Sequence, residues 1–447
     1  MSDPKLGSPR NERRRYAIVG TGARAEMFAR AIAVTHADRG ELVALADPNP
    51  ARTRAYNELL GRLGAAPARE YDVADVTAML DRESIDTLVV CTVDRAHDTY
   101  VVAALDAGRD VICEKPMTID VSRCQRILDA AGRSGRNVAV TFNYRFNPLH
   151  EAVRDLLAGG EIGEVGSVHF EWLLDIRHGA DYFRRWHRDK ANSGGLLVHK
   201  ATHHFDLVNW WLAAAPERVY AEGRLFFYGE AGARHGYDRG YGRAYGSAAA
   251  KDDPFALDLT ANDGLRRLYL DAEAHDGYQR DRNVFAPGVS IEDDLAVIVR
   301  YDTGATMSYH LTAYAPWEGY RVMVNGSKGR LELEVVESDH VAPAAAGAVK
   351  GASLHGADAA AEQGWYRLRV CPYWRPPYEV DVPGYTRTGH GGADARMNAV
   401  LFGGATDPLR RQATERDGAV SLLTGLAANE SLATGQPITV RDLLPLS

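Results

Sequence analysis

The sequence is poor in cysteine, in long apolar runs and in basic charge. Four of its 447 residues are cysteine (Cys91, Cys113, Cys124 and Cys371), and their spacing matches no metal site. Cys91 and Cys113 lie in apolar, strand-like runs, so we expect buried free thiols in a reducing compartment, without a disulfide framework. No window approaches the roughly 18 continuous apolar residues that a membrane span requires.

Charge and chain length narrow the class of protein further. Net charge is −8 and the pI is about 6.0, so no global field favours nucleic acid or anionic lipid, and neither is expected as a partner. Residues 1–14 are polar and lack the apolar stretch of a signal peptide, which predicts a disordered tail on a cytoplasmic protein. The length allows two or three domains of roughly 150 residues each.

A glycine-rich turn follows the first apolar run, Tyr16–Val19. The turn has the pattern G-x-G-x-x-A between a strand and a helix, which is typical of dinucleotide binding. Its residues, all predicted to contact the cofactor, are Gly20, Thr21, Gly22, Ala23, Arg24 and Ala25. Asp47 ends the next strand about 20 residues further on, where an acid receives the ribose hydroxyls. This arrangement favours NAD over NADP, although Arg52 and Arg54 oppose that preference; Asp47 as a plain helix cap is the alternative.

Strands and helices then alternate as far as residue 142. Residues 86–92 form an unbroken apolar run, as a parallel sheet buried on both faces requires. Helix-like segments at 98–107 and 121–131 separate it from short apolar strands at 111–113 and 138–142. Such alternation predicts a doubly wound Rossmann domain over residues 15–143.

Further motifs make the chain resemble the Gfo/Idh/MocA family of sugar oxidoreductases. These motifs extend from the glycine-rich turn to the C-terminal part of the chain. They include Thr92-x-x-x-x-His97, Glu114-Lys115-Pro116, Tyr144-Arg145-Phe146, Gly194-Gly195-Leu196, His203 with Asp206, and Ile291–Asp294. The resemblance implies a Rossmann domain followed by an open, predominantly antiparallel sheet. It implies that substrate binds between this sheet and the nicotinamide, and that another subunit covers the open face to give a homo-oligomer.

The second half of the chain supports such a sheet independently. Six segments read as strands, several with alternating polarity: residues 165–174, 218–227, 295–301, 306–312, 320–324 and 330–335. Residues 229–253 and 341–363 read as long loops, one of which is expected to be a lid or an oligomer arm. We assign residues 144–447 to this α+β domain for substrate binding and oligomerisation.

Lys115 is the first candidate for catalysis. A lysine ammonium beside a sugar hydroxyl lowers the pKa of the alcohol and stabilises the developing alkoxide. Lys115 ends a predicted strand at the carboxyl edge of the sheet, and the alternative is a surface lysine. In the family the bond to the following proline is often cis.

His203 is the second candidate, because imidazole can accept a hydroxyl proton near neutral pH. The family pattern D-x-x-x-H places the base at His203, but its aspartate is replaced here by His199, which Lys200 follows. His199 is therefore a further catalytic candidate, and Lys200 and Asp206 are candidates for substrate binding. His199, His203 and Asp206 also resemble a metal triad, but we predict no metal.

The segment 175–190 concentrates arginine and histidine in an acidic protein. Arginine there suits a planar anion such as a carboxylate or sulfonate, which predicts an acidic sugar; a salt-bridged surface loop is the alternative. Further candidates complete the predicted site. For substrate they are Asp175, His178, Arg188, the possible stacking residues Tyr182 and Trp186, the cleft residue Arg145 and the loop residue His390; for cofactor they are Thr92, Glu114, Asn143 and His97, the last as a helix cap.

Three functions follow from these residues. The first is an NAD-dependent oxidoreductase that acts on a secondary hydroxyl of a pyranose, cyclitol or acidic sugar. The second is an NAD-dependent glycoside hydrolase, in which transient ring oxidation permits elimination, water addition and re-reduction; the His390 loop and His199 motivate it. The third is a nucleotide sensor without catalysis, which the presence of both Lys115 and His203 disfavours.

Overall fold

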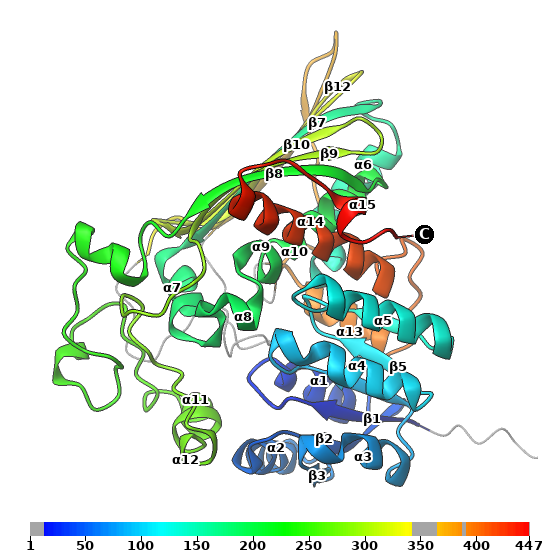
Figure 1. The fold of residues 1–447 in the computed structure, drawn as a ribbon. Coiled ribbons are helices and arrows are strands. Elements are labelled where there is room, and N and C mark those ends of the chain that lie inside the picture. Colours follow the sequence, from blue (N-terminus) through cyan, green and yellow to red (C-terminus); the bar gives the residue numbers. More distant parts are fainter. Residues whose placement is uncertain (1–12, 342–363, 387–389, 447) are drawn as a thin grey trace, which may run out of the picture.

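The protein is built on two β-sheets with helices between and around them (Figure 1). The structure is a computed structural model that describes residues 13–341, 364–386 and 390–446. Most of the predicted tail and of the predicted loop at 341–363 lies outside the described residues. No helix in the described part of the chain is both long and apolar enough to cross a membrane.

The first sheet is the predicted Rossmann sheet. Its parallel strands lie in the order β6-β5-β4-β1-β2-β3, the order of dinucleotide-binding folds. They are β1 (Arg14–Val19), β2 (Gly40–Ala46), β3 (Arg69–Tyr71), β4 (Thr87–Val90), β5 (Asp110–Cys113) and β6 (Val138–Val140). Because β1 begins at Arg14, the predicted tail extends one residue too far. A short strand from the C-terminal part of the chain, β15 (Ala413–Thr414), pairs antiparallel with β6.

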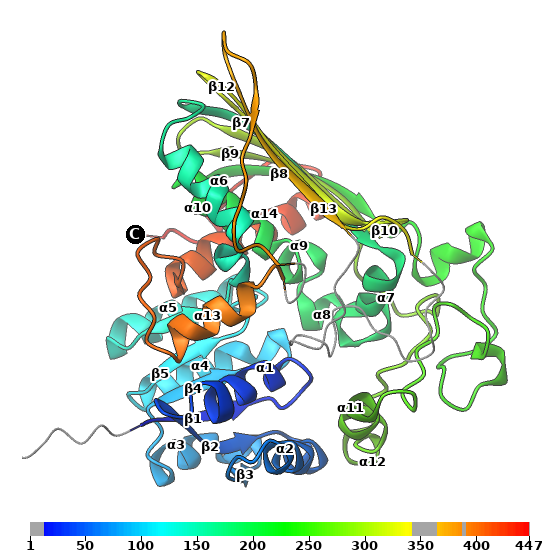
Figure 2. The same ribbon diagram turned by 180° about the vertical axis from the view of Figure 1, so that it is seen from behind.

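Helices cover both faces of this sheet (Figures 1 and 2). Local signals set their ends: Asn49 caps α2, with Pro50 as its first residue, and α5 runs from its cap Asp120 to Gly135 in a left-handed conformation. The helical segments are α1 (Ala25–Arg30), η1 (Ala31–Thr35), α2 (Pro50–Arg62), η2 (Val73–Asp75), α3 (Val76–Arg82), η3 (Asp94–Ala96), α4 (His97–Asp106) and α5 (Val121–Ser134).

The second sheet confirms the predicted, mostly antiparallel architecture. Its order is β14-β13-β12-β11-β7-β10-β9-β8-β16, and only β7 and β10 run parallel. All six predicted strands are present, and β13, β14 and β16 add to them. Their bounds are β7 (Val165–Asp175), β8 (Pro216–Arg224), β9 (Asp294–Tyr301), β10 (Thr306–Ala315), β11 (Glu318–Gly326), β12 (Gly329–Ser338), β13 (Trp365–Pro372), β14 (Tyr378–Glu379) and β16 (Ile438–Thr439).

The strand predicted for residues 218–227 ends early, at Arg224. The carboxylate of Asp293 explains this, because it accepts the backbone N–H groups of Phe226, Phe227 and Tyr228 and turns the chain away from the sheet. A long excursion over residues 225–293 follows before β9. It contains the whole of the predicted loop 229–253, in which the short helices η6 (Gly229–His235) and η7 (Ala248–Ala250) lie.

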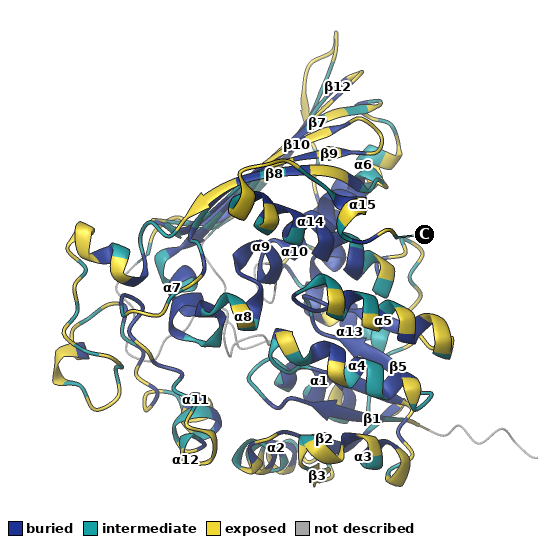
Figure 3. Ribbon diagram, in the orientation of Figure 1, coloured by how far each residue is buried: buried dark blue, intermediate teal, exposed yellow. Residues whose placement is uncertain are grey.

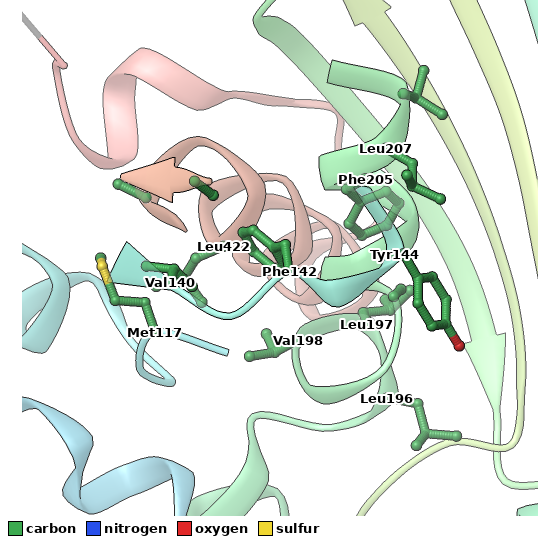
Figure 4. Packing of buried hydrophobic residues seen from close by; sticks show 14 of the residues in the cluster. Met117, Val140, Phe142, Tyr144, Leu196, Leu197, Val198, Phe205, Leu207 and Leu422 are labelled. Atoms are coloured by element: carbon green, nitrogen blue, oxygen red, sulfur yellow. The ribbon is translucent and has the colours of Figure 1, made fainter. Parts of the chain in front are cut away.

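The core between the two sheets holds the site in place. Alternate residues of β7, including Phe170 and Trp172, face inward and are fully buried, whereas exposed residues lie along the outer face (Figure 3). Phe142, Phe205 and Leu422 pack in the layer that joins the domains (Figure 4). The remaining helical segments are η4 (Asn143–Phe146), α6 (Pro148–Ala158), α7 (Ile176–Arg184), η5 (Trp186–Arg188), α8 (Lys190–Ser193), α9 (Leu196–His199), α10 (Thr202–Leu212), α11 (Asp263–Leu265), η8 (Arg266–Leu270), α12 (Glu273–Asp276), α13 (Ala393–Leu401), α14 (Glu415–Thr434) and α15 (Val440–Leu443).

Candidate active site

A cavity of ≈ 570 Å³ lies between the carboxyl edge of the first sheet and the helices of the second domain. Most of the predicted site residues line it. They are Gly20, Gly22, Ala23, Arg24, Asp47, Thr92, His97, Glu114, Lys115 and Asn143 from the predicted cofactor set, and His178, Tyr182, Trp186, His199, Lys200, His203 and His390 from the rest. Thr21 and Ala25 are buried behind this lining.

The glycine-rich turn has the shape that a dinucleotide needs. Gly20 has φ +86°, and a Cβ there would lie 2.6 Å from backbone atoms of Cys91 and Thr92, so no other residue fits. Gly22 leaves open space toward the cavity, with its nearest neighbour 3.9 Å from a virtual Cβ. The Asp47 carboxylate is held at the end of β2 by the Thr21 N–H (2.7 Å) and hydroxyl (3.0 Å). These residues therefore fit a pyrophosphate and a ribose.

Lys115 follows β5 and points across the cavity. The Lys115–Pro116 peptide bond is cis, and Lys115 Nζ donates a hydrogen bond to the His199 carbonyl at 3.2 Å. Burial lowers the pKa of Lys115 to about 8, against the opposing attraction of Glu114 and Asp94. Its ammonium is thus still protonated at neutral pH, but it gives up its proton more readily than a surface lysine.

His199 pairs with a carboxylate that the sequence reasoning missed. His199 Nδ1 lies 2.5 Å from Asp94 Oδ2, and both side chains are buried. Asp94 begins η3, shortly after β4, within the Thr92-x-x-x-x-His97 motif. Burial raises the pKa of the Asp94 carboxyl, while burial and the nearby Lys115 lower the pKa of His199. Asp94 therefore brings a carboxylate from the first domain to His199, the position at which the family pattern has aspartate.

His203 is set for proton transfer. It stacks on Tyr144 with ring centroids 4.3 Å apart, and its Nδ1 is buried without a hydrogen-bond partner in the described residues. Burial, with Lys115 and Lys200, lowers the pKa of His203 well below its usual value, so the ring is neutral at pH 7. Lys200 Nζ donates to the Tyr144 hydroxyl at 3.0 Å and lies 4.8 Å from the centre of the Trp172 ring.

A second histidine–carboxylate pair lies further along the same wall. His178 Nδ1 is 2.7 Å from Oε1 of the buried Glu318, at the start of β11. The Tyr182 hydroxyl is 3.4 Å from His178 Nε2, and the Tyr182 ring lies 5.6 Å from the ring of His199. Tyr182 therefore sits between two imidazoles, each with its own carboxylate. Glu318 was not predicted from the sequence.

Four predicted substrate contacts need correction, since none of them lines the cavity. Arg145 is buried in an ion pair with Asp206 (2.6 Å), so both residues support the core. Asp175 caps α7 by accepting the N–H groups of its first turn. Arg188 points the other way and donates to backbone carbonyls, including that of Pro287 at 2.8 Å. From the same segment, Arg185 lines the cavity instead.

His97 and Asp47 are also clarified by the structure. His97 begins α4 but does not cap it; its ring nitrogens contact the carbonyls of Pro116 (2.8 Å) and Thr92 (3.2 Å), which ties the loop after β4 to the Lys115 loop. Asp47 is not the cap of α2, because Asn49 has that role.

His390 lies at the edge of the cavity, in a loop whose Gly389 is outside the described residues. It has φ 57°, and its Nδ1 lies 2.9 Å from Asp394 and 3.2 Å from Asn143 Nδ2. Within the described residues, no group of three or more histidine, cysteine or acidic side chains is placed to hold a metal ion.

Comparisons with known proteins agree with this architecture. The family described as "Oxidoreductase family, NAD-binding Rossmann fold" matches residues 14–142, and its "C-terminal alpha/beta domain" matches residues 154–440. YteT of Bacillus subtilis (strain 168), which is named as an oxidoreductase, is 33% identical over 439 residues, which cover 96% of this chain and 98% of YteT. Inositol 2-dehydrogenase of Rhizobium meliloti (strain 1021) is 29% identical over 224 residues, 50% of this chain and 62% of that protein.

Solved structures share the fold at low identity. The WlbA dehydrogenase of Bordetella pertussis, in complex with NADH and UDP-GlcNAcA, has a TM-score of 0.62 at 19% identity, covering 98% of this chain and 100% of that one. An Agrobacterium radiobacter oxidoreductase in complex with NAD+, L-tartaric acid and magnesium has a TM-score of 0.62 at 16% identity, covering 97% and 100%. With its NAD-binding Rossmann domain and its mostly antiparallel second sheet, the chain belongs to the Gfo/Idh/MocA oxidoreductase family.

Proposed function

We propose that the protein is an NAD-dependent oxidoreductase that moves hydride between a secondary hydroxyl of a sugar or cyclitol and nicotinamide. One observation carries the proposal: Lys115, His203 and the Asp94–His199 pair line the same cavity as the glycine-rich turn. A relative named inositol 2-dehydrogenase supports the substrate class.

Lys115, His203 and His199 have different roles in this reaction. When bound, NAD would accept hydride from the carbinol carbon. The Lys115 ammonium stabilises negative charge on the substrate oxygen as its proton leaves, and neutral His203 accepts that proton. Asp94 holds His199 through Nδ1, which directs Nε2 of His199 away from the carboxylate as a second site for a substrate hydroxyl.

A direct assay tests this function. Purified protein is incubated with NAD and a panel of pyranoses, cyclitols and sugar acids, and NADH is followed by absorbance. We expect at least one substrate class to give NADH, and expect His203→Asn to lose activity while it still binds NADH. Binding of the nucleotide without turnover of any sugar or glycoside would count against the proposal.

Arg185 favours an acidic sugar within this class. Its Nε is held by Asp181 at 3.0 Å, and the side chain lines the cavity. Asp181 is shared among three guanidinium groups, those of Arg184, Arg185 and Arg280, which leaves an excess of positive charge at this wall. A carboxylate on the substrate would balance it.

A matched pair of substrates tests the acidic preference. We expect Arg185→Gln to raise KM for a uronate about tenfold or more, and to leave KM for the corresponding neutral sugar nearly unchanged. An equal effect on both sugars would show that Arg185 supports the fold of the site and does not recognise charge.

A redox-neutral glycoside hydrolase is the second candidate. It needs a further acid and base for the C2 proton and the leaving group, and the Glu318–His178 pair with Tyr182 supplies suitable groups in the same cavity. Incubating glycosides with the protein in D2O separates the two functions. Deuterium at C2 of the released sugar, without net NADH, would identify the hydrolase; net NADH without glycoside cleavage would exclude it.

We also propose that the chain forms a homo-oligomer through the outer face of the second sheet. Exposed residues lie along that face (Figure 3). They include Ile298 of β9, and ion pairs on the same face join Arg321 to Glu171 and Glu334. Light scattering of the wild type and of Ile298→Glu tests this assignment, because a buried charge would weaken the assembly.

A further inference from the structure

A segment of the second domain reaches back over the nucleotide end of the cavity. Residues 262–280, here called the strap, comprise α11, η8 and α12 and belong to the excursion between β8 and β9. In both views the strap lies beside α2 of the Rossmann domain, far from the second sheet (Figures 1 and 2). Three of its residues, Tyr269, Asp276 and Tyr278, line the cavity next to Asp47 and Arg52.

The strap is bonded to the parts of the first domain that would surround a dinucleotide. The Arg52 guanidinium bonds to Asp276 (2.7 Å) and to the Leu268 carbonyl (3.1 Å), and Asn49 donates to the Ala272 carbonyl (2.9 Å). Leu268 is buried in the same apolar cluster as Phe28 and Tyr56 of the Rossmann domain. The strap therefore packs onto the Rossmann domain through both hydrogen bonds and apolar contacts.

Tyr269 meets the glycine-rich turn itself. The N–H of Ala23 donates to the Tyr269 hydroxyl at 3.2 Å, and that oxygen would lie 3.9 Å from a Cβ on Gly22. The turn's backbone is where such folds hold a pyrophosphate. Because the tyrosine oxygen accepts a hydrogen bond from this backbone, its own proton is available for a phosphate oxygen.

The charges around Arg52 favour NAD over NADP. Arg52 is the basic residue closest to Asp47 at the predicted ribose end, 3.5 Å away, and would otherwise be free to meet a 2′-phosphate. Asp276 engages it, so that two carboxylates face one guanidinium. A third negative group is therefore disfavoured there. The second basic residue, Arg54, is exposed.

The far end of the strap is fixed to the second domain. Arg280 is fully buried and bonds to Asp181 of α7 at 2.7 Å. The strap thus runs from one domain to the other along the edge of the cavity. A dinucleotide seated between Asp47 and Gly22 would lie under Tyr269 and Asp276, and its departure would require these contacts to break.

From these contacts we propose that the strap is part of the cofactor site, in which the Tyr269 hydroxyl binds the pyrophosphate and Asp276 sets the preference for NAD. The strap also slows the release of the bound cofactor. The inference rests on the proposed function in assuming a nicotinamide dinucleotide in this cavity. Retention suits a reaction that returns the hydride within one cycle, as the hydrolase does, or one in which a second sugar regenerates the cofactor.

The dissociation rate of NADH tests the strap without relying on activity. Full-length protein is loaded with NADH, and the loss of bound-state fluorescence is followed after adding excess NAD. We expect Tyr269→Phe and Asp276→Asn each to release NADH about tenfold faster or more, the effect of one hydrogen bond to a charged group. Asp276→Asn should also reduce the preference for NAD, so that the affinity for NADP comes closer to the affinity for NAD. Tyr245→Phe, on the same excursion but outside this cavity, is the matched control.

The possible outcomes separate the strap from the proposed function. If both variants release NADH at the wild-type rate and have the wild-type melting temperature, the proposed role of the strap is wrong. The proposed oxidoreductase function is then unaffected. If both variants release NADH faster but the protein turns over no sugar or glycoside, the role of the strap in cofactor binding is supported and the proposed function is refuted. Failure of the wild type to bind any nicotinamide dinucleotide would overturn both.

Discussion

Replacing Lys115 with methionine should stabilise the protein while it removes activity. Burial lowers the pKa of Lys115 from 10.5 to about 8, a change worth roughly 3 kcal/mol between its two protonation states. This shift already includes the attraction of Glu114 and Asp94, so it measures the net penalty of the charge in the folded protein. Lys115 is only partly buried, so solvent screening reduces that penalty. We expect a gain of about 1–2 kcal/mol in the free energy of unfolding at pH 7.

The sign of the pH dependence makes this prediction specific. Between pH 8 and 10.5 the unfolded chain binds more protons at Lys115 than the folded protein does, so the wild type gains stability as pH rises through this window. The gain in the free energy of unfolding from Lys115→Met should therefore be complete below pH 8 and vanish near pH 10.5. Urea unfolding at several pH values measures it, with Lys328→Met on the exposed surface as the control. A destabilised variant at pH 7, or a gain that does not change with pH, would refute the reasoning.

Three further variants follow from the same geometry. Asp94→Asn should lower kcat about 10- to 100-fold with NADH affinity unchanged, because His199 loses its carboxylate at 2.5 Å; steady-state kinetics beside a binding titration would show it, and equal losses in both would contradict it. Gly20→Ala should abolish nucleotide binding in a fluorescence titration, since its Cβ would lie 2.6 Å from the backbone of Cys91 and Thr92. Arg145→Met should cost about 3–5 kcal/mol in chemical denaturation, because Asp206 stays buried without its partner, while the folded fraction keeps its KM; a selective rise in KM would restore Arg145 to the substrate site.

The sequence was most informative where the signal is local. The glycine turn, Asp47 and the apolar strands of the first sheet follow from short patterns, because each describes one turn or one strand buried on both faces. The six predicted strands of the second sheet follow from alternating polarity in the same way. β13 alternates as well and could have been recognised: Leu368 and Val370 are buried, with less buried residues between and beside them.

The two histidine–carboxylate pairs could not be predicted because their partners are far apart in the chain. Asp94 and His199 are 105 positions apart, and His178 and Glu318 are 140 apart. Nothing local distinguishes either acid from a surface carboxylate. The choice between Arg185 and Arg188 is of the same kind, since the two lie three positions apart in one segment and only tertiary packing turns one toward the cavity.

His199, which stands where the family pattern has aspartate, is bonded to a carboxylate from a distant part of the chain and is distinct from the proposed base, His203. In the family pattern D-x-x-x-H, the acid and the histidine are four positions apart in the chain, so their relative position is set locally. Here the carboxylate comes from η3 of the Rossmann domain and the imidazole from α9 of the second domain, and they meet at 2.5 Å only because the domains are packed together. Lys115 crosses the same boundary through its bond to the His199 carbonyl. Any change that separates the domains therefore breaks the Asp94–His199 pair and moves Lys115 at once. Within this reading, the strap would contribute to catalysis as well as to cofactor retention, because it too ties the second domain to the first.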